Sequence, residues 1–314
     1  MQTNRKRVLM ALDGSEQSAD MVRYAAGFLP AGETEAVLFH VKSTMPEAFR
    51  DLALSPASFK GDEGIKEWIE EQERSIEEFM EEGRRILLDA GFPPESIRVE
   101  VRDLKEGFAR DIVAEAVRGY DAIALGRSGV NPLEEAVLGS IAAKIAIKLC
   151  RVPICLVGGS PSAEKVLIAL DSSDSAMLGV DLTGKMLNGT TGEVKLMHVV
   201  RGLHNSLAGY QKVFLGEYLE RLCREAEDAI RPVFEEAIDH LTAVGIPAER
   251  VTTKVVCGVK SRAGAIMKEA VTGGYGTIIA GRRGLTRVTD YDMGRVSYKI
   301  VQMARDRAVW IVGC

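Results

Sequence analysis

Residues Val8–Glu16 read VLMALDGSE, and residues Val166–Asp174 read VLIALDSSD. The two stretches place Asp13 and Asp171 at equivalent positions, 158 residues apart. Each begins with an apolar run of the length of a buried strand and ends in residues typical of a turn. Because the chain has 314 residues, a match at this distance indicates that one unit occurs twice.

Further matches extend the repeat along both halves. Val37–Val41 corresponds to Lys195–Val199, again 158 residues on, and three glycines recur 155 residues on: Gly126, Gly129 and Gly139 as Gly281, Gly284 and Gly294. Between the copies stands GGSPSAE, a composition typical of linkers. The sequence therefore predicts two tandem domains, residues 1–157 and 165–314, joined by a linker at 158–164.

Strands and helices alternate within each copy. In the first, apolar runs predict strands near 7–12, 35–41, 97–102, 121–125 and 153–157, with helices near 16–29, 63–90, 107–118 and 138–149. The strands are rich in Val, Ile and Leu without polar alternation, as expected when helices cover both faces of a sheet. We therefore predict an α/β fold with two tandem, doubly wound, five-stranded parallel sheets.

The composition excludes several classes of protein. Hydrophobic residues make up 46% and charged residues 27%, which is enough apolar surface for packed cores. A net charge of −5 argues against nucleic acid as a partner, and no apolar run is long enough for a membrane span. The start of the chain does not resemble a signal peptide, so we expect a cytoplasmic protein. The cysteines form no CxxC pair, and we expect thiols rather than disulfides or a zinc site.

The segment from Gly126 to Ser140, GRSGVNPLEEAVLGS, is the strongest candidate for a binding site. It follows a predicted strand and leads into a predicted helix, whose free N–H groups favour phosphate. Glycines allow backbone N–H groups to approach an anion, and Asp13 follows another strand whose end lies at the same edge of the sheet. The same residues could also form only a turn and a helix cap, since no Walker A sequence is present.

These residues resemble the universal stress protein family, over nearly the whole chain. The resemblance rests on VLMALDGSEQS, LFHV, DAIALGRSGV and VLGSIAAKI, and on the pattern G-x2-G-x9-G-S/T. It implies a strand order of 3-2-1-4-5 and a site for ATP. By this resemblance Asp13 would contact the ribose or a Mg²⁺ ion on the phosphates, and the Val41 backbone would contact adenine. The ribose and phosphates would fall to Gly126, Arg127, Gly129, Gly139, Ser140 and Ile141.

The second copy departs from this pattern. Asp171, Val199, Gly281, Gly284 and Gly294 are retained, but Arg295 stands where the family has Ser or Thr. Arg295 could bind phosphate or fill the pocket, and Ser297 could substitute for the missing hydroxyl. Whether this second site binds nucleotide is left open by the sequence.

We therefore expect a cytoplasmic ATP-binding protein of stress response or signalling, with adenine nucleotide as its effector. The alternatives are an interaction module with vestigial nucleotide sites and a slow ATP hydrolase. His40 and His198 occupy equivalent strand positions, and we interpret them as packed rather than catalytic residues. The two domains are expected to pair through their edge strands, with pairing of two whole chains as a further option.

Overall fold

The computed structural model describes residues 5–46, 63–129, 138–187, 192–202, 212–284 and 293–313. Its first domain contains the strands and helices that the sequence predicts, within a few residues at each end. The strands are β1 (Lys6–Ala11), β2 (Thr34–Lys42), β3 (Ile97–Asp103), β4 (Ala122–Gly126) and β5 (Ile154–Val157). The α-helices are α1 (Glu16–Phe28), α3 (Glu63–Asp89), α4 (Phe108–Ala116) and α5 (Ser140–Lys148), with short 3-10 turns at Ala31–Glu33 and Pro94–Ser96.

The second domain repeats this order. Its strands are β6 (Lys165–Ala169), β7 (Glu193–Arg201), β8 (Val251–Val259), β9 (Thr277–Gly281) and β10 (Ala308–Val312). Its α-helices are α6 (Asp174–Leu187), α7 (Lys212–Ala243), α8 (Arg262–Thr272) and α9 (Arg295–Met303), with a 3-10 turn at Ala248–Arg250.

All ten strands belong to one continuous sheet, in the order β3-β2-β1-β4-β5-β10-β9-β6-β7-β8. Each half has the order 3-2-1-4-5, which confirms the expected topology. Pairing within each half is parallel, and the halves meet through an antiparallel pair of β5 and β10. The register places Trp310 opposite Cys155 and Ile311 opposite Ile154. The predicted edge-strand pairing of the two domains is therefore confirmed.

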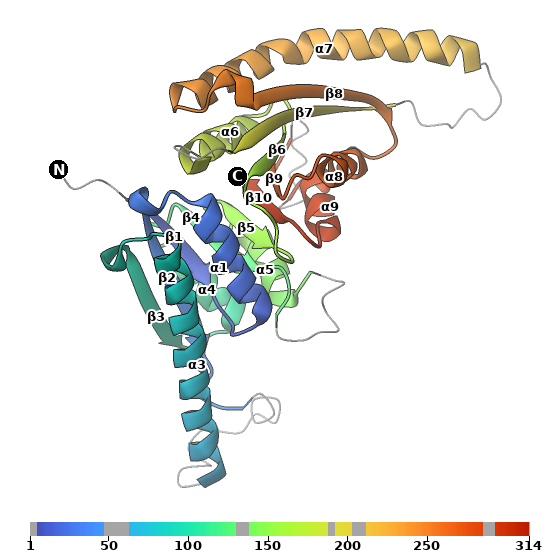
Figure 1. Cartoon of the computed structure of the whole chain (residues 1–314). Helices are drawn as coiled ribbons and strands as arrows, with labels where there is room; N and C mark the ends of the chain where they lie inside the picture. Colours follow the sequence, from blue (N-terminus) through green and yellow to red (C-terminus); the bar gives the residue numbers. More distant parts are fainter. Residues whose placement is uncertain are drawn as a thin grey trace.

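Helices cover both faces of this sheet, which is why its strands are apolar on both sides. One face packs against α1, α3, α6 and α7, through buried residues such as Phe28, Met80 and Leu241. The other packs against α4, α5, α8 and α9, through buried residues such as Ile112, Ile145 and Ile300. Figure 1 shows the two domains one above the other, with α3 extending beyond the body of the first.

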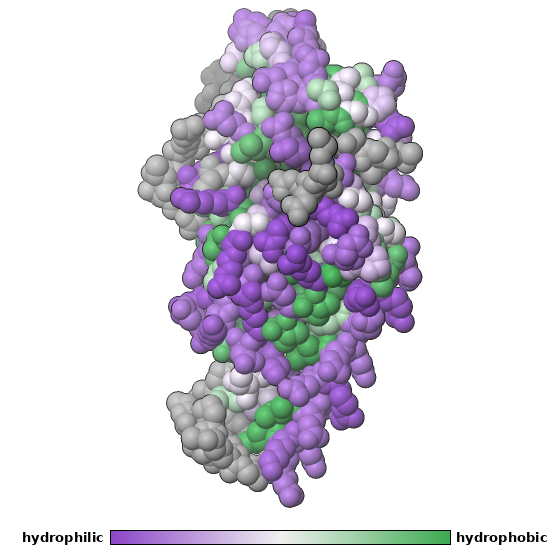
Figure 2. Space-filling model, turned by 90° about the vertical axis from the view of Figure 1, so that its left-hand side faces the viewer, coloured by the Kyte–Doolittle hydropathy of each residue, from purple (hydrophilic) through white to green (hydrophobic). Residues whose placement is uncertain are grey.

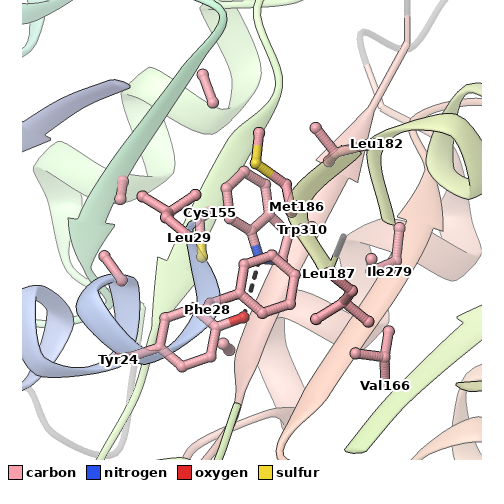
Figure 3. Close-up of a cluster of buried hydrophobic side chains, with 14 of the residues drawn as sticks. Tyr24, Phe28, Leu29, Cys155, Val166, Leu182, Met186, Leu187, Ile279 and Trp310 are labelled. Carbon is pink, nitrogen blue, oxygen red and sulfur yellow. Dashed lines mark hydrogen bonds between the residues drawn. The ribbon is translucent and has the colours of Figure 1, made fainter. Parts of the chain in front are cut away.

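The junction of the domains is a shared core (Figure 3). Tyr24 and Phe28 of α1 pack beside Trp310 of β10, whose ring centroid lies 5.4 Å from that of Phe28. Trp310 Nε1 donates to the Tyr24 hydroxyl at 3.0 Å, and that hydroxyl lies 2.9 Å from Thr277 Oγ1. Burial of these aromatic side chains joins the hydrophobic cores of the two halves.

The surface is mostly hydrophilic on the side where β3 lies, with apolar residues in separate areas (Figure 2). As an edge strand, β3 leaves Val99 and Val101 46% and 42% exposed. Within the described residues, no helix is long and apolar enough to cross a membrane.

The expectation for the cysteines is wrong. Cys223 of α7 forms a disulfide with Cys257 of β8, with the two Cα atoms 5.8 Å apart, and Cys150 is also disulfide-bonded. Cys155 is a free and fully buried thiol. The bond between Cys223 and Cys257 spans 34 residues and depends on the packing of α7 against β8, so no local spacing in the sequence indicates it.

Candidate functional site

We call the switch point where β1 and β4 end side by side, between Asp13 and Gly129, the first crevice. The two strands are parallel neighbours, with Ala11 paired to Leu125, so the segments after them leave the sheet at one edge. Asp13 follows β1 and Gly129 follows β4. A Cβ atom placed on Gly129 would lie 3.0 Å from Oδ2 of Asp13. The carboxylate and the glycine loop, which the sequence places 116 residues apart, therefore face each other.

The two oxygens of Asp13 have different surroundings. Oδ1 accepts hydrogen bonds from the Ser15 backbone N–H at 3.0 Å and from the Ser15 hydroxyl at 2.6 Å. Ser15 in turn caps α1 by accepting from the Ser18 N–H. Oδ1 thus holds the turn after β1, which leaves Oδ2 directed toward the loop.

The three glycines of the motif, Gly126, Gly129 and Gly139, have different neighbours. A Cβ on Gly126 would lie 3.4 Å from Gln17 of α1, and one on Gly139 would lie 3.2 Å from the Arg127 carbonyl oxygen. These two glycines allow the loop to pack tightly on α1 and on itself. Gly129 is the one whose missing side chain faces Asp13. The sequence predicts that all three glycines serve the approach of an anion, and their spacing alone does not reveal this difference between them.

The N-terminus of α5 completes the crevice. Gly139 is the N-cap residue, and within the described part of the chain no side chain caps this end. The first-turn N–H groups of a helix have no intrahelical partner, and the helix dipole makes this end positive. Ser140 and Ile141 are the first residues of the helix, and both are exposed. This end of α5 can therefore receive an anion.

Val41 and His40 lie at the end of β2, next to β1. Val41 is 3% exposed, so it can offer only its backbone to a ligand. His40 Nδ1 lies 2.8 Å from the Leu12 carbonyl oxygen. The His40 and Phe79 rings pack edge to face, with their centroids 5.1 Å apart. Burial lowers the pKa of His40, although the Leu12 carbonyl and the Asp13 carboxylate act in the opposite direction. His198 makes the equivalent bond to Leu170 at 2.9 Å. Both histidines are packed against backbone carbonyls.

Arg127 points away from the crevice. Its side chain is 2% exposed and reaches the second domain, where Nη2 donates to the Gln302 carbonyl oxygen at 2.9 Å. The sequence suggested Arg127 as a contact for ribose or phosphate. In this structure only its backbone remains on the side of the loop.

The second crevice repeats the same frame. A Cβ on Gly284 would lie 2.7 Å from Oδ2 of Asp171, and Gly294 is the N-cap residue of α9. Arg295 is exposed at the first position of that helix. The Ser297 hydroxyl donates to the Gly281 carbonyl oxygen at 2.6 Å and is buried, so its proton is already used.

Sequence reasoning missed Arg262, the first residue of α8. Its Nε donates to the Val199 carbonyl oxygen at 3.1 Å, and thus occupies a backbone group at the end of β7. The first domain has Phe108 at the equivalent position, 154 residues earlier. Aligning the helix starts of the two copies would have revealed this exchange of an aromatic residue for a cation.

The described residues contain no group of three or more His, Cys, Asp or Glu side chains that could hold a metal ion by themselves. Within the described part of the chain, Asp13 offers one carboxylate oxygen, Oδ2, to the first crevice. Mg²⁺ bound with nucleotides commonly takes one or two carboxylates and the phosphates, so this donor set fits a nucleotide-borne ion.

Fold and crevices together define a tandem α/β protein with a glycine loop and a helix N-terminus at each switch point of its sheet. The universal stress protein family matches residues 4–157 and again 163–312. The chain therefore belongs to the universal stress protein family, with two copies of its domain.

Comparison with individual proteins agrees with this assignment. Universal stress protein YxiE of Bacillus subtilis (strain 168) is 24% identical over 145 residues, which cover 45% of this chain and 93% of that protein. A crystal structure of a universal stress protein from Archaeoglobus fulgidus DSM 4304 has a TM-score of 0.64 at 21% identity, covering 100% of this chain and 99% of the other. A functionally unknown protein from Pseudomonas aeruginosa PAO1 has a TM-score of 0.58 at 13% identity, covering 99% and 93%. At these identities the structures support the fold alone.

Proposed function

We propose that the first domain binds ATP as an effector, and that the protein acts in stress response or signalling. The observation that carries the proposal is Oδ2 of Asp13, which faces Gly129 beside the N-terminus of α5, where none of the described residues provides a side-chain cap. A carboxylate oxygen opposite a positive helix end suits a ligand with both hydroxyl groups and phosphates. A nucleotide has this combination.

Each part of the nucleotide has a matching group in the crevice. The phosphates would lie on the N–H groups of Ser140 and Ile141, with the Ser140 hydroxyl as a further donor. Oδ2 of Asp13 would accept from the ribose or bind a Mg²⁺ ion on the phosphates. Adenine would contact the Val41 backbone, and Gly126 and Gly129 would contribute backbone groups. The Arg127 N–H donates to the Val157 carbonyl oxygen and its own carbonyl accepts from Gly139, so Arg127 serves the loop rather than the ligand. A bound effector stabilises whichever conformation binds it best.

The second crevice differs from the first at the end of β7 and at the start of α9. Arg262 occupies the Val199 carbonyl, the group equivalent to the one proposed to contact adenine. Arg295 replaces the serine at the helix start. We infer that the chain binds one nucleotide, in the first domain. The second domain then serves as a structural partner of the first.

We also propose that the protein is located in the cytoplasm. Disulfides are uncommon in the cytoplasm of most organisms, and the bond between Cys223 and Cys257 bears against that location. Fractionation of cells that carry the natural gene would decide the matter.

The experiment is a calorimetric titration of Mg-ATP into nucleotide-stripped protein, with G129A and G284A as matched variants. We expect one ATP per chain. A methyl group on Gly129 would lie 3.0 Å from Oδ2 of Asp13, so G129A should weaken binding by at least about tenfold. G284A places the same methyl group in the second crevice and should leave the affinity unchanged.

Three results would contradict this assignment. Full affinity in a folded G129A protein would remove the first crevice from the site. Loss of binding in G284A alone would move the nucleotide to the second domain. Absence of adenine nucleotide binding by the wild-type protein would favour an interaction module whose crevices are vestigial.

A further inference from the structure

Each glycine loop carries a buried arginine whose side chain binds the other domain. Arg127 follows Gly126, and Arg282 follows Gly281, so the two occupy the same position in the repeated motif. Their side chains are 2% and 0% exposed. Buried arginines need hydrogen-bond partners, because an isolated buried charge is costly. In both cases the arginine donates to backbone carbonyl groups of the other domain.

The contacts are reciprocal. Arg282 donates from Nη1 to the Ala146 carbonyl oxygen at 2.8 Å and from Nη2 to the carbonyl oxygen of Leu149. Arg127 donates from Nη2 to the Gln302 carbonyl oxygen at 2.9 Å and from Nε to that of Val301 at 3.4 Å. Each arginine thus binds carbonyl groups in the last turn of the other domain's final helix.

A cation is most favourable at the C-terminal end of a helix. The last carbonyl groups of a helix have no intrahelical donors, and the helix dipole makes that end negative. Arg282 satisfies two such groups at the end of α5, and Arg127 does the same for α9. Gly158 gives Arg127 room to pass, since a Cβ there would lie 3.1 Å from its Cδ and collide with the Arg305 carbonyl.

The opposite end of each helix faces a crevice. α5 begins at Ser140, next to the glycine loop of the first domain, and ends at Lys148, beside Arg282. Its nine residues span roughly 13 Å. The loop of the second domain therefore holds the far end of the helix that presents the first site. In the same way, the loop of the first domain holds the far end of α9.

We propose that Arg282 is a positioning residue for the nucleotide site of the first domain, whereas Arg127 fixes the last turn of α9 in the second domain. This inference rests on the proposed function of the first crevice. Arg282 touches no ligand in this proposal. It fixes the axial position of α5, and with it the N–H groups of Ser140 and Ile141. Each crevice then depends on the arginine side chain that the other domain supplies.

The test compares R282M, R282K and Y24F in the full-length protein. R282M removes the charge and all donors at similar length, whereas R282K keeps a charge with fewer donors in a different geometry. Y24F is the matched control, because it removes a buried hydroxyl that also bonds across the domain junction but touches neither glycine loop. The measurements are Mg-ATP affinity by calorimetry, amide hydrogen exchange across residues 140–148, and the thermal midpoint.

We expect R282M to weaken ATP binding by roughly 5- to 20-fold and to speed exchange in α5, with R282K between R282M and wild type. Y24F should lower the thermal midpoint but leave affinity and α5 exchange at wild-type values. The inference is overturned if R282M lowers only the thermal midpoint, as Y24F does. If wild-type protein binds no ATP, the proposed function fails, and α5 exchange alone then decides whether Arg282 positions the helix.

Discussion

At the scale of single residues, each crevice depends on atoms that already serve the fold. Oδ1 of Asp13 holds the turn that begins α1, and Oδ2 is left for a ligand. His40 is bound to the Leu12 carbonyl at the same edge of the sheet. Substitutions here therefore act on stability and on binding together, and tests must separate the two effects.

His40 should make the first domain sensitive to acid. Because burial lowers its pKa in the folded protein, the unfolded chain takes up the proton at a higher pH than the folded chain. The stability that neutral His40 contributes is fully present above the pKa of the unfolded chain, near 6.5, and is lost as the pH falls through the lower folded value.

The check is thermal unfolding of wild type and H40N between pH 8 and pH 5. Asn can still donate to the Leu12 carbonyl but does not titrate. We expect the wild-type midpoint to fall more steeply below pH 6.5 than the H40N midpoint. Parallel curves for the two proteins would show that His40 does not contribute.

At the scale of the elements, the second domain has a disulfide between its long helix and its edge strand, and the described residues of the first domain have none between the equivalent elements. The disulfide joins α7 to the edge strand β8. In the first domain the corresponding pair, α3 and β3, is held by packing of residues such as Met80, Leu87 and Ile97. The disulfide thus fastens the outermost layer at one end of the sheet.

Loss of this disulfide should destabilise the second domain. The bond closes a segment with a sequence separation of 34, for which chain entropy predicts about 3–4 kcal/mol of stabilisation. We expect the C223S/C257S protein to unfold at lower denaturant concentration, measured by circular dichroism without reductant. Each single variant should match the double variant, because each removes the same bond. Equal midpoints for wild type and double variant would refute the prediction.

Much of the fold could be predicted because its causes are local. Apolar runs without polar alternation predicted the strands, and the internal repeat predicted the two domains. The facing of Asp13 and Gly129 followed from strand neighbours that the family resemblance implied. The partners of Arg127 and the Cys223–Cys257 pair could not be predicted, because they depend on contacts 175 and 34 residues away that leave no local pattern. Arg262 was detectable only by aligning the two copies.

At the scale of the whole molecule, the shared core makes the two domains one thermodynamic unit. Trp310 is 1% exposed and packs against Tyr24 and Phe28 of the first domain, while its own strand belongs to the second. The antiparallel pair of β5 and β10 continues the sheet through the same junction. Neither half can unfold without exposing apolar surface of the other.

Calorimetry of the wild-type protein should therefore show one cooperative transition. Trp310→Ala should lower the free energy of unfolding by about 3–5 kcal/mol and split the transition in two, because it removes the largest side chain of the junction. The control is Trp68→Phe, a half-buried position near the start of α3 and outside the junction, which should keep a single transition near the wild-type midpoint. Two transitions in the wild-type protein would contradict the prediction.

The antiparallel junction also bears on how the two halves can change over time. When two identical chains associate, every substitution is present in both copies, so a harmful change in one crevice is harmful in the other. Here one polypeptide carries both halves, and each always meets the same neighbour. Arg262 and Arg295 can thus alter one crevice while Phe108 and Ser140 are kept in the other. Tethering permits a division of labour that a symmetric pair could not evolve.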